Sequence, residues 1–169
     1  MTGPVDKGIV GTNLVACGRN HMLTIECATE ADLPAILDLY LQAGIDDDAH
    51  LPLEQAKVIF ARMRSYPNYH LYVARNESGA VGTFALLIMD NLGHLGACTG
   101  VVEDVAVHPA MQGQGVGKAM MEFAKEQCRK SGCYKLTLSS NLKRHSAHTF
   151  YQSLGFEQHG YSFVIDPGS

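Results

Sequence analysis

Three glycines alternate with other residues in the segment 112–118, which reads Gln-Gly-Gln-Gly-Val-Gly-Lys. A strand-like apolar run, residues 101–107, precedes this segment, and apolar residues at helical spacing follow it as far as residue 130. Glycine lets the backbone turn sharply, and the first amides of a helix have no acceptor within the helix. The segment therefore predicts a strand, a tight turn and a helix whose amino end can hold a phosphate group.

The spacing of these glycines excludes the two best-known phosphate turns. A P-loop needs a longer interval before Lys-Ser or Lys-Thr, whereas Lys118 is followed by Ala119. A dinucleotide fingerprint has a different glycine spacing and belongs to the first strand and helix of its domain. A different phosphate ligand is indicated.

Hydrophobic periodicity predicts an α/β fold in which a mixed sheet carries helices on both faces. Asp32 should be the cap of the first helix, because Pro34 is tolerated only in a first helical turn. The expected elements, in chain order, are a strand at 23–27, helices at 32–41 and 53–66, strands at 70–75, 81–89 and 101–107, a helix at 115–130, a strand at 134–138, a helix at 143–154 and a strand at 161–165.

Residues 1–22 show no regular periodicity and are predicted to be a leader, either native or recombinant, since His21-Met22 lies where a recombinant leader joins a native start. Residues 23–169 are then expected to form one domain.

Composition narrows the choice of partners and compartment. A formal charge of −4 disfavours a nucleic-acid surface, and no apolar stretch is long enough to span a membrane. The five cysteines contain no C-x-x-C pair, so neither a disulfide framework nor a zinc knuckle is indicated. A cytoplasmic protein is expected.

Residues 23–165 resemble the GNAT superfamily of N-acetyltransferases. The family signature Gln/Arg-x-x-Gly-x-Gly/Ala is met by Gln112, Gly115 and Gly117, after the strand Val-Glu-Asp-Val-Ala-Val-His-Pro at 102–109. The resemblance implies a mostly antiparallel, twisted sheet of six to seven strands with about four helices. It also implies transfer of an acetyl group from acetyl-CoA to a primary amine of a small molecule.

The same resemblance implies which residues bind the cofactor. The turn would hold the pyrophosphate of coenzyme A, and the preceding strand would bond the pantetheine arm through its backbone. Asn141 would contact the pantetheine or cap the next helix. The implied cofactor-binding residues are Val105, Ala106, Val107, Gln112, Gly113, Gln114, Gly115, Val116, Gly117, Lys118 and Asn141.

Acetyl transfer to an amine needs a base for the ammonium proton and an acid for the departing thiolate. By resemblance, Tyr151 is the acid, although its helical spacing also suits a core tyrosine. Glu103 and Asp104 are candidate bases. Since side chains alternate along a strand, only one of them should face the acceptor pocket, and both could instead be structural ion-pair partners.

A basic cluster precedes Tyr151 and consists of Lys143, Arg144, His145 and His148. It could bind a phosphate or phosphonate group of the acceptor, or simply face solvent. Residues 138–151 resemble aminoalkylphosphonate N-acetyltransferases, whereas residues 112–117 and 132–135 resemble glucosamine-6-phosphate N-acetyltransferases. The acidic run at 46–48 favours polycationic amines instead. No metal site is expected, because the two histidines have no evident third ligand.

Two other functions fit the same residues. One is acetylation of a protein or peptide amine, which requires an open groove; the other is a non-catalytic acyl-CoA-binding regulatory module. A homodimer could form through an edge strand at 161–165.

Overall fold

The computed structural model describes residues 13–17, 21–45 and 49–168. The chain divides into two compact units, residues 1–137 and residues 138–169. The acidic run at 46–48 lies outside the described residues.

The first unit is built on a sheet whose strands follow chain order. Its central pairs are all antiparallel: β1 with β2, β2 with β3, β3 with β4, and β4 with β5. The six strands of the described chain are β1 (Asn13–Cys17), β2 (His21–Cys27), β3 (Tyr69–Asn76), β4 (Gly79–Met89), β5 (Thr99–Val107) and β6 (Lys135–Leu138). The predicted mixed α/β class with a mostly antiparallel sheet is confirmed.

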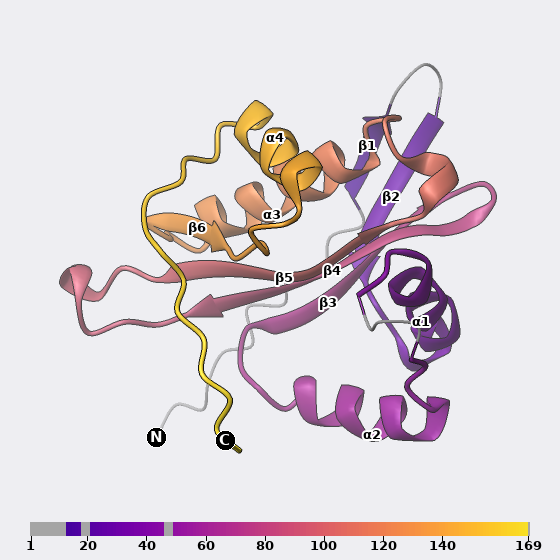
Figure 1. Cartoon of the computed structure of the whole chain (residues 1–169), viewed down its shortest axis with the longest axis horizontal. Coiled ribbons are helices and arrows are strands. Elements are labelled where there is room, and N and C mark those ends of the chain that lie inside the picture. Colours follow the sequence, from indigo (N-terminus) through magenta and orange to yellow (C-terminus); the bar gives the residue numbers. More distant parts are fainter. Residues whose placement is uncertain (1–12, 18–20, 46–48, 169) are drawn as a thin grey trace. The chain divides into compact units, whose positions relative to one another are not determined.

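Helices α1 (Leu33–Gln42) and α2 (Leu53–Met63) lie on one side of this sheet (Figure 1). Both were predicted from their apolar spacing. Their buried side chains form one cluster with Leu71 of β3 and Ala85 of β4, which face each other in the strand register. This cluster packs the two helices against the sheet.

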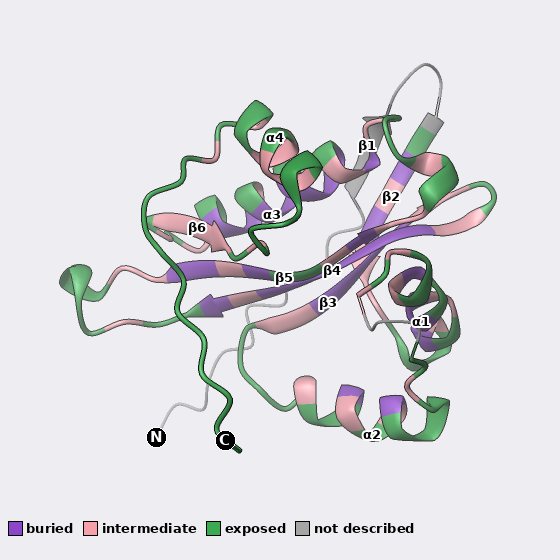
Figure 2. Ribbon diagram, in the orientation of Figure 1, coloured by how far each residue is buried: buried purple, intermediate pink, exposed green. Residues whose placement is uncertain are grey.

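Helix α3 (Val116–Lys130) covers the opposite side of the sheet (Figure 1). The ring of Phe123 packs edge-on against Tyr72, with 5.0 Å between the ring centroids. A β-carbon added to Gly82 would lie 2.6 Å from the Met120 sulfur and 3.3 Å from the Ala106 carbonyl oxygen. The absence of a side chain at Gly82 therefore lets α3 approach β4 closely, which fixes the position of its amino end. Figure 2 shows the buried residues concentrated along the central strands.

The second unit contains α4 (His145–Ser153), and the segment after it has no regular structure. The strand predicted at 161–165 is wrong. An extended segment becomes a strand only when its backbone amides and carbonyls pair with a neighbour, and no strand pairs with this one in the described chain. Its apolar side chains Tyr161, Phe163, Val164 and Ile165 are all more than 80% exposed.

The expectation of an irregular leader over residues 1–22 needs correction as well. Asn13–Cys17 forms β1 and pairs with β2, which begins at His21 rather than Leu23. Pairing with a neighbouring strand supplies the regular structure that hydrophobic periodicity did not indicate. Residues 1–12 and 18–20 lie outside the described chain.

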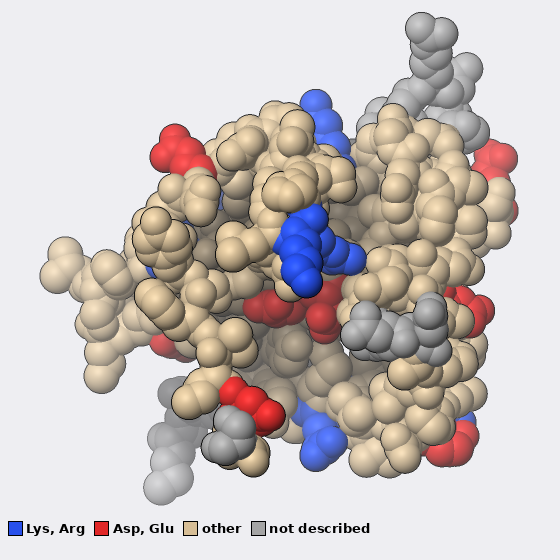
Figure 3. Space-filling view, in the orientation of Figure 1, with Lys and Arg blue, Asp and Glu red and all other residues tan. Residues whose placement is uncertain are grey.

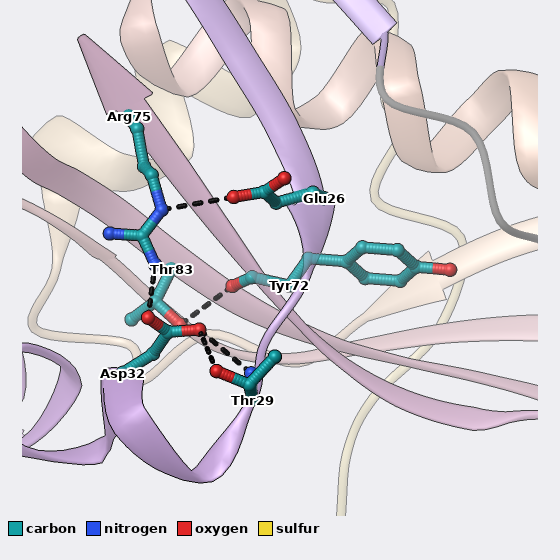
Figure 4. Close-up of polar contacts among 6 residues, drawn as sticks. All are labelled: Glu26, Thr29, Asp32, Tyr72, Arg75 and Thr83. Atoms are coloured by element: carbon teal, nitrogen blue, oxygen red, sulfur yellow. Dashed lines mark hydrogen bonds and ion pairs between the residues drawn. The ribbon is translucent and has the colours of Figure 1, made fainter. Parts of the chain in front are cut away.

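The connection between β2 and α1 is held by a polar network (Figure 4). Asp32 occupies the residue before α1, as predicted, but its carboxylate accepts from the Thr29 amide at 2.7 Å and the Thr29 hydroxyl at 3.0 Å. Arg75 of β3 donates both to Asp32 and, at 3.0 Å, to Glu26 of β2. The network ties the start of α1 to two strands.

Replacing Asp32 by asparagine should lower the free energy of unfolding by about 2 kcal/mol at neutral pH, because the charge-assisted bond from Arg75 is lost. Burial of Asp32 opposes its ionisation, but hydrogen bonds from Thr29 and Arg75 outweigh burial, so its pKa is lowered. Its ionisation thus stabilises the fold above the unfolded-state pKa of about 4, and this stability disappears as the pH falls through the lowered folded-state pKa.

Urea titrations at neutral and acid pH measure this effect, and the deficit of the variant should shrink toward acid pH. Glu126→Gln is the matched control, because Glu126 pairs only with exposed cations on α3 and its replacement should change stability little. An equal deficit at both pH values would show that the Asp32 charge contributes nothing.

Two further features concern the described residues only. None of their helices has the length and apolar character needed to cross a membrane. Cys27, Cys98, Cys128 and Cys133 form no disulfide bond among these residues.

Candidate active site

The predicted glycine turn joins β5 to α3. A short 3-10 turn (Pro109–Met111) follows the strand, and Gly113 and Gly115 then adopt left-handed backbone angles, with φ of +73° and +90°. Side chains with a β-carbon rarely adopt such angles, which explains why glycine occupies both positions. Gly115 is the residue immediately before α3.

Backbone amides are available at this helix start. The Ala119 amide donates to the Gly115 carbonyl at 3.0 Å, so the preceding amides of Val116, Gly117 and Lys118 have no acceptor within the helix. These amides and the positive end of the helix dipole favour an anion at this point. The turn consequently has the geometry that a phosphate group requires.

Two glutamine side chains of the same turn donate hydrogen bonds to nearby backbone carbonyls. Gln114 donates through Nε2 to the Ala110 carbonyl at 2.7 Å, and Gln112 donates to the Val107 carbonyl at 3.4 Å. Both bonds connect the turn to the end of β5 or the residues just after it. They favour a preformed loop over one that orders only when a ligand binds.

A β-bulge interrupts β5 just before the turn. Ala85 of β4 faces Glu103, whereas Thr83 faces Ala106, so β5 has one residue more than β4 over this stretch. Asp104 has a left-handed φ of +52°. The bulge breaks the alternation expected for Glu103 and Asp104: Glu103 shares its face with Ala85, and Asp104 lines a cavity formed by α1 and α2 on that same face.

Two exposed carboxylates therefore stand together on the α1 and α2 side of β5, and Figure 3 shows acidic side chains gathered over β4 and β5. Burial raises the pKa of the Glu103 carboxyl above its ordinary value, and the charge of Asp104 adds to the rise. Burial and then these two carboxylates raise the pKa of Tyr69. Glu103 is thus easier to protonate than an ordinary glutamate.

The second unit carries the other predicted residues. Asn141 accepts through Oδ1 from the Lys143 amide at 2.9 Å, and its carbonyl oxygen lies 3.0 Å from His148 Nε2. These bonds shape the turn that leads into α4, whose N-cap residue is Arg144. His145 and His148 have ring centroids 6.0 Å apart, and their surroundings form no metal-binding group in the described chain.

Tyr151 lies in the second half of α4, between two other aromatic rings. Its ring centroid is 5.1 Å from that of Phe150 and 5.7 Å from that of Phe156. Burial raises the pKa of its phenol, and the nearby Arg144 only partly offsets this rise. The phenol therefore keeps its proton well into the alkaline range.

Comparison with known proteins identifies the fold. The model of the acetyltransferase (GNAT) domain matches residues 67–158, which is more than half of the chain. The chain belongs to the GNAT acetyltransferase family.

Named GNAT relatives act on different amines. The aminoalkylphosphonate N-acetyltransferase of Salmonella typhimurium is 33% identical over 58% of this chain and 63% of its own length. The glucosamine 6-phosphate N-acetyltransferase of Trypanosoma brucei brucei is 37% identical over 68% of this chain and 76% of its own. A crystal structure of a Trypanosoma brucei acetyltransferase has a TM-score of 0.71 at 30% identity, covering 85% of this chain and 99% of that one.

Within this GNAT chain, the first unit brings together one set of predicted residues, from Glu103 to Val107 and from Gln112 to Lys118. The second unit contains the others, from Asn141 to Tyr151. Sequence reasoning missed the bulge and its effect on Asp104. Two successive charged residues inside an otherwise apolar strand were the signal, because charges on both faces of a covered strand would leave one of them buried.

Proposed function

We propose that this GNAT protein transfers the acetyl group of acetyl-CoA directly to a primary amine of a small molecule. The observation that carries the proposal is the turn at Gly115, where left-handed glycines leave the first amides of α3 ready for the pyrophosphate. The backbone of Val105–Val107 would bond the pantetheine arm, with Asn141 at the start of the second unit as a further contact.

Glu103 and Asp104, the two carboxylates at the bulge, are proposed to bind and deprotonate the amine. Asp104 would bind the ammonium group, and Glu103 would remove its proton through a water, for which a raised pKa is suited. The amine nitrogen then forms a bond to the acetyl carbon while the carbon–sulfur bond breaks. Tyr151 would donate its phenolic proton to the departing thiolate. The second proton that the nitrogen loses as the amide forms would pass to solvent, and Tyr151 would be reprotonated from solvent.

The names of relatives suggest one class of acceptor. Two of them are named for amines that carry a phosphonate or phosphate group. An acceptor of that kind would find basic contacts at Lys143, Arg144, His145 and His148. The cytoplasmic location and the homodimer remain predictions. The exposed apolar residues at 161–165 are a surface that a second copy of the chain could cover.

Turnover against a panel of amines tests the proposed function. Release of free coenzyme A should be measured with aminoalkylphosphonates, amino sugars, polyamines, aminoglycosides, arylalkylamines and peptides. The expected result is amine-dependent release with at least one small molecule and none with peptides. Peptide-only turnover would favour the protein acetyltransferase, and acetyl-CoA binding without any turnover would favour the regulatory module.

A further inference from the structure

A cavity of about 200 Å³ lies between α1, α2 and β3 in the first unit. Apart from one carboxylate, its lining is aliphatic or aromatic, and no lysine or arginine belongs to it among the described residues. The residues that line it are Leu33, Ile36, Leu37, Tyr40, Ile45, Leu51, Ala56, Ile59, Phe60, Met63, Leu71 and Asp104.

The size of this cavity matches a definite chemical group. The cavity is partly open to solvent, so a ligand can enter it from solution. Apolar cavities of roughly 150 Å³ accept a benzene-sized molecule and exclude water. The cavity could thus hold a phenyl ring or a branched alkyl group of similar bulk.

The single carboxylate in the lining would fix the orientation of an amine bound in this cavity. Asp104 belongs to its lining and stands on the bulge next to Glu103, the proposed base. A cation at this point would be attracted by both carboxylates, whereas a phosphate or phosphonate would be repelled and would lose its hydration. The aromatic rings of Tyr40 and Phe60 also suit an apolar or cationic guest.

We propose that the acceptor is a primary amine with an apolar substituent, bound with its ammonium group at Asp104 and its aryl or branched alkyl group in the cavity. This substrate class rests on the proposed acetyl transfer and makes it more specific. It differs from the phosphorus-bearing amines for which the two relatives are named.

A matched pair of acceptors tests this substrate class. 2-Phenylethylamine and 2-aminoethylphosphonate share the aminoethyl group and differ in having a phenyl ring or a phosphonate at its end. The value of kcat/KM should be at least roughly tenfold higher for phenylethylamine, since apolar groups of this size give discrimination of that order. A preference for the phosphonate would overturn the inference while leaving the proposed function intact.

A cavity-filling variant tests the location. Ala56 is buried on α2 and lines the cavity, so Ala56→Leu should occupy part of it without leaving a void. The variant should lower kcat/KM for phenylethylamine roughly tenfold or more and leave ethylamine, which lacks the ring, almost unaffected. Val58→Leu is the matched control, because Val58 lies on the same helix and is 62% exposed. Equal losses for both amines, or none, would place the ring elsewhere.

Calorimetry with the amine alone tests the apolar amine site independently of the proposed acetyl transfer. If no amine is acetylated, the proposed function fails, but the cavity can still be tested by titrating phenylethylamine into the protein. Heat of binding that Ala56→Leu abolishes and Val58→Leu retains would support an apolar amine site. Absence of binding to the wild-type protein in this case would overturn the inference.

Discussion

Replacing Gly115 by aspartate should weaken acetyl-CoA binding by roughly a hundredfold or more. The substitution would place a carboxylate beside the amides of Val116 and Gly117, where the pyrophosphate is proposed to bind, and the two negative charges would repel each other. Gly115 also has a φ of +90°, an angle at which the backbone of any residue with a side chain is strained. Aspartate tolerates left-handed angles better than most residues and is favourable at a helix start, so the fold should survive.

Two variants separate the charge from the strain. Gly115→Asn has nearly the same shape without the charge and should bind acetyl-CoA more tightly than Gly115→Asp. Gly132→Asp introduces the same side chain at a glycine with φ of +74° after the other end of α3, in open space. It should retain wild-type affinity by calorimetry. Equal loss in the variants at 115 and 132 would attribute the effect to general destabilisation.

Replacing Tyr151 by phenylalanine should lower kcat by about a hundredfold to ten-thousandfold, the usual contribution of a general acid. The phenol is proposed to protonate the departing thiolate, and phenylalanine fills the same space between Phe150 and Phe156 without a proton to donate. Affinity for acetyl-CoA should stay the same, because the pyrophosphate contacts are untouched. Steady-state kinetics and calorimetry together check both statements.

The pH dependence of kcat provides a second readout for Tyr151. Burial raises the pKa of this phenol, so the wild-type rate should fall only at strongly alkaline pH, as the phenol loses its proton. This fall should be absent in Tyr151→Phe. Tyr66→Phe is the control, since Tyr66 is 58% exposed and lies just after α2. An unchanged kcat in Tyr151→Phe would remove Tyr151 from the mechanism.

Much of the fold could be predicted because local patterns agree with the tertiary structure. Helices α1, α2 and α3 each carry an apolar face that is buried against the sheet. The spacing of their hydrophobic residues in the sequence therefore indicated which residues pack. The turn at Gly115 was predictable for a different reason: only glycine adopts its backbone angles without strain, and a strand and a helix pattern flank it.

The misses have a common cause, which is dependence on strand partners. Strand β1 exists because it pairs with β2, and the segment 161–165 has strand-like alternation but no paired neighbour in the described chain. The bulge at Asp104 likewise depends on the register between β4 and β5. Pairing between segments far apart in the sequence is weakly encoded in either segment alone, so periodicity could not predict these features.

Calorimetric titration with three thioesters tests the role of the Gly115 turn most directly. Acetyl-CoA and its 3′-dephospho form both retain the diphosphate, whereas S-acetylpantetheine has lost it along with the adenosine. We expect the first two to bind with affinities within about tenfold of each other and S-acetylpantetheine to bind at least roughly a hundredfold more weakly, because it offers no diphosphate to the amides of α3. Comparable affinity for all three, or no binding of acetyl-CoA, would contradict a diphosphate site at this turn.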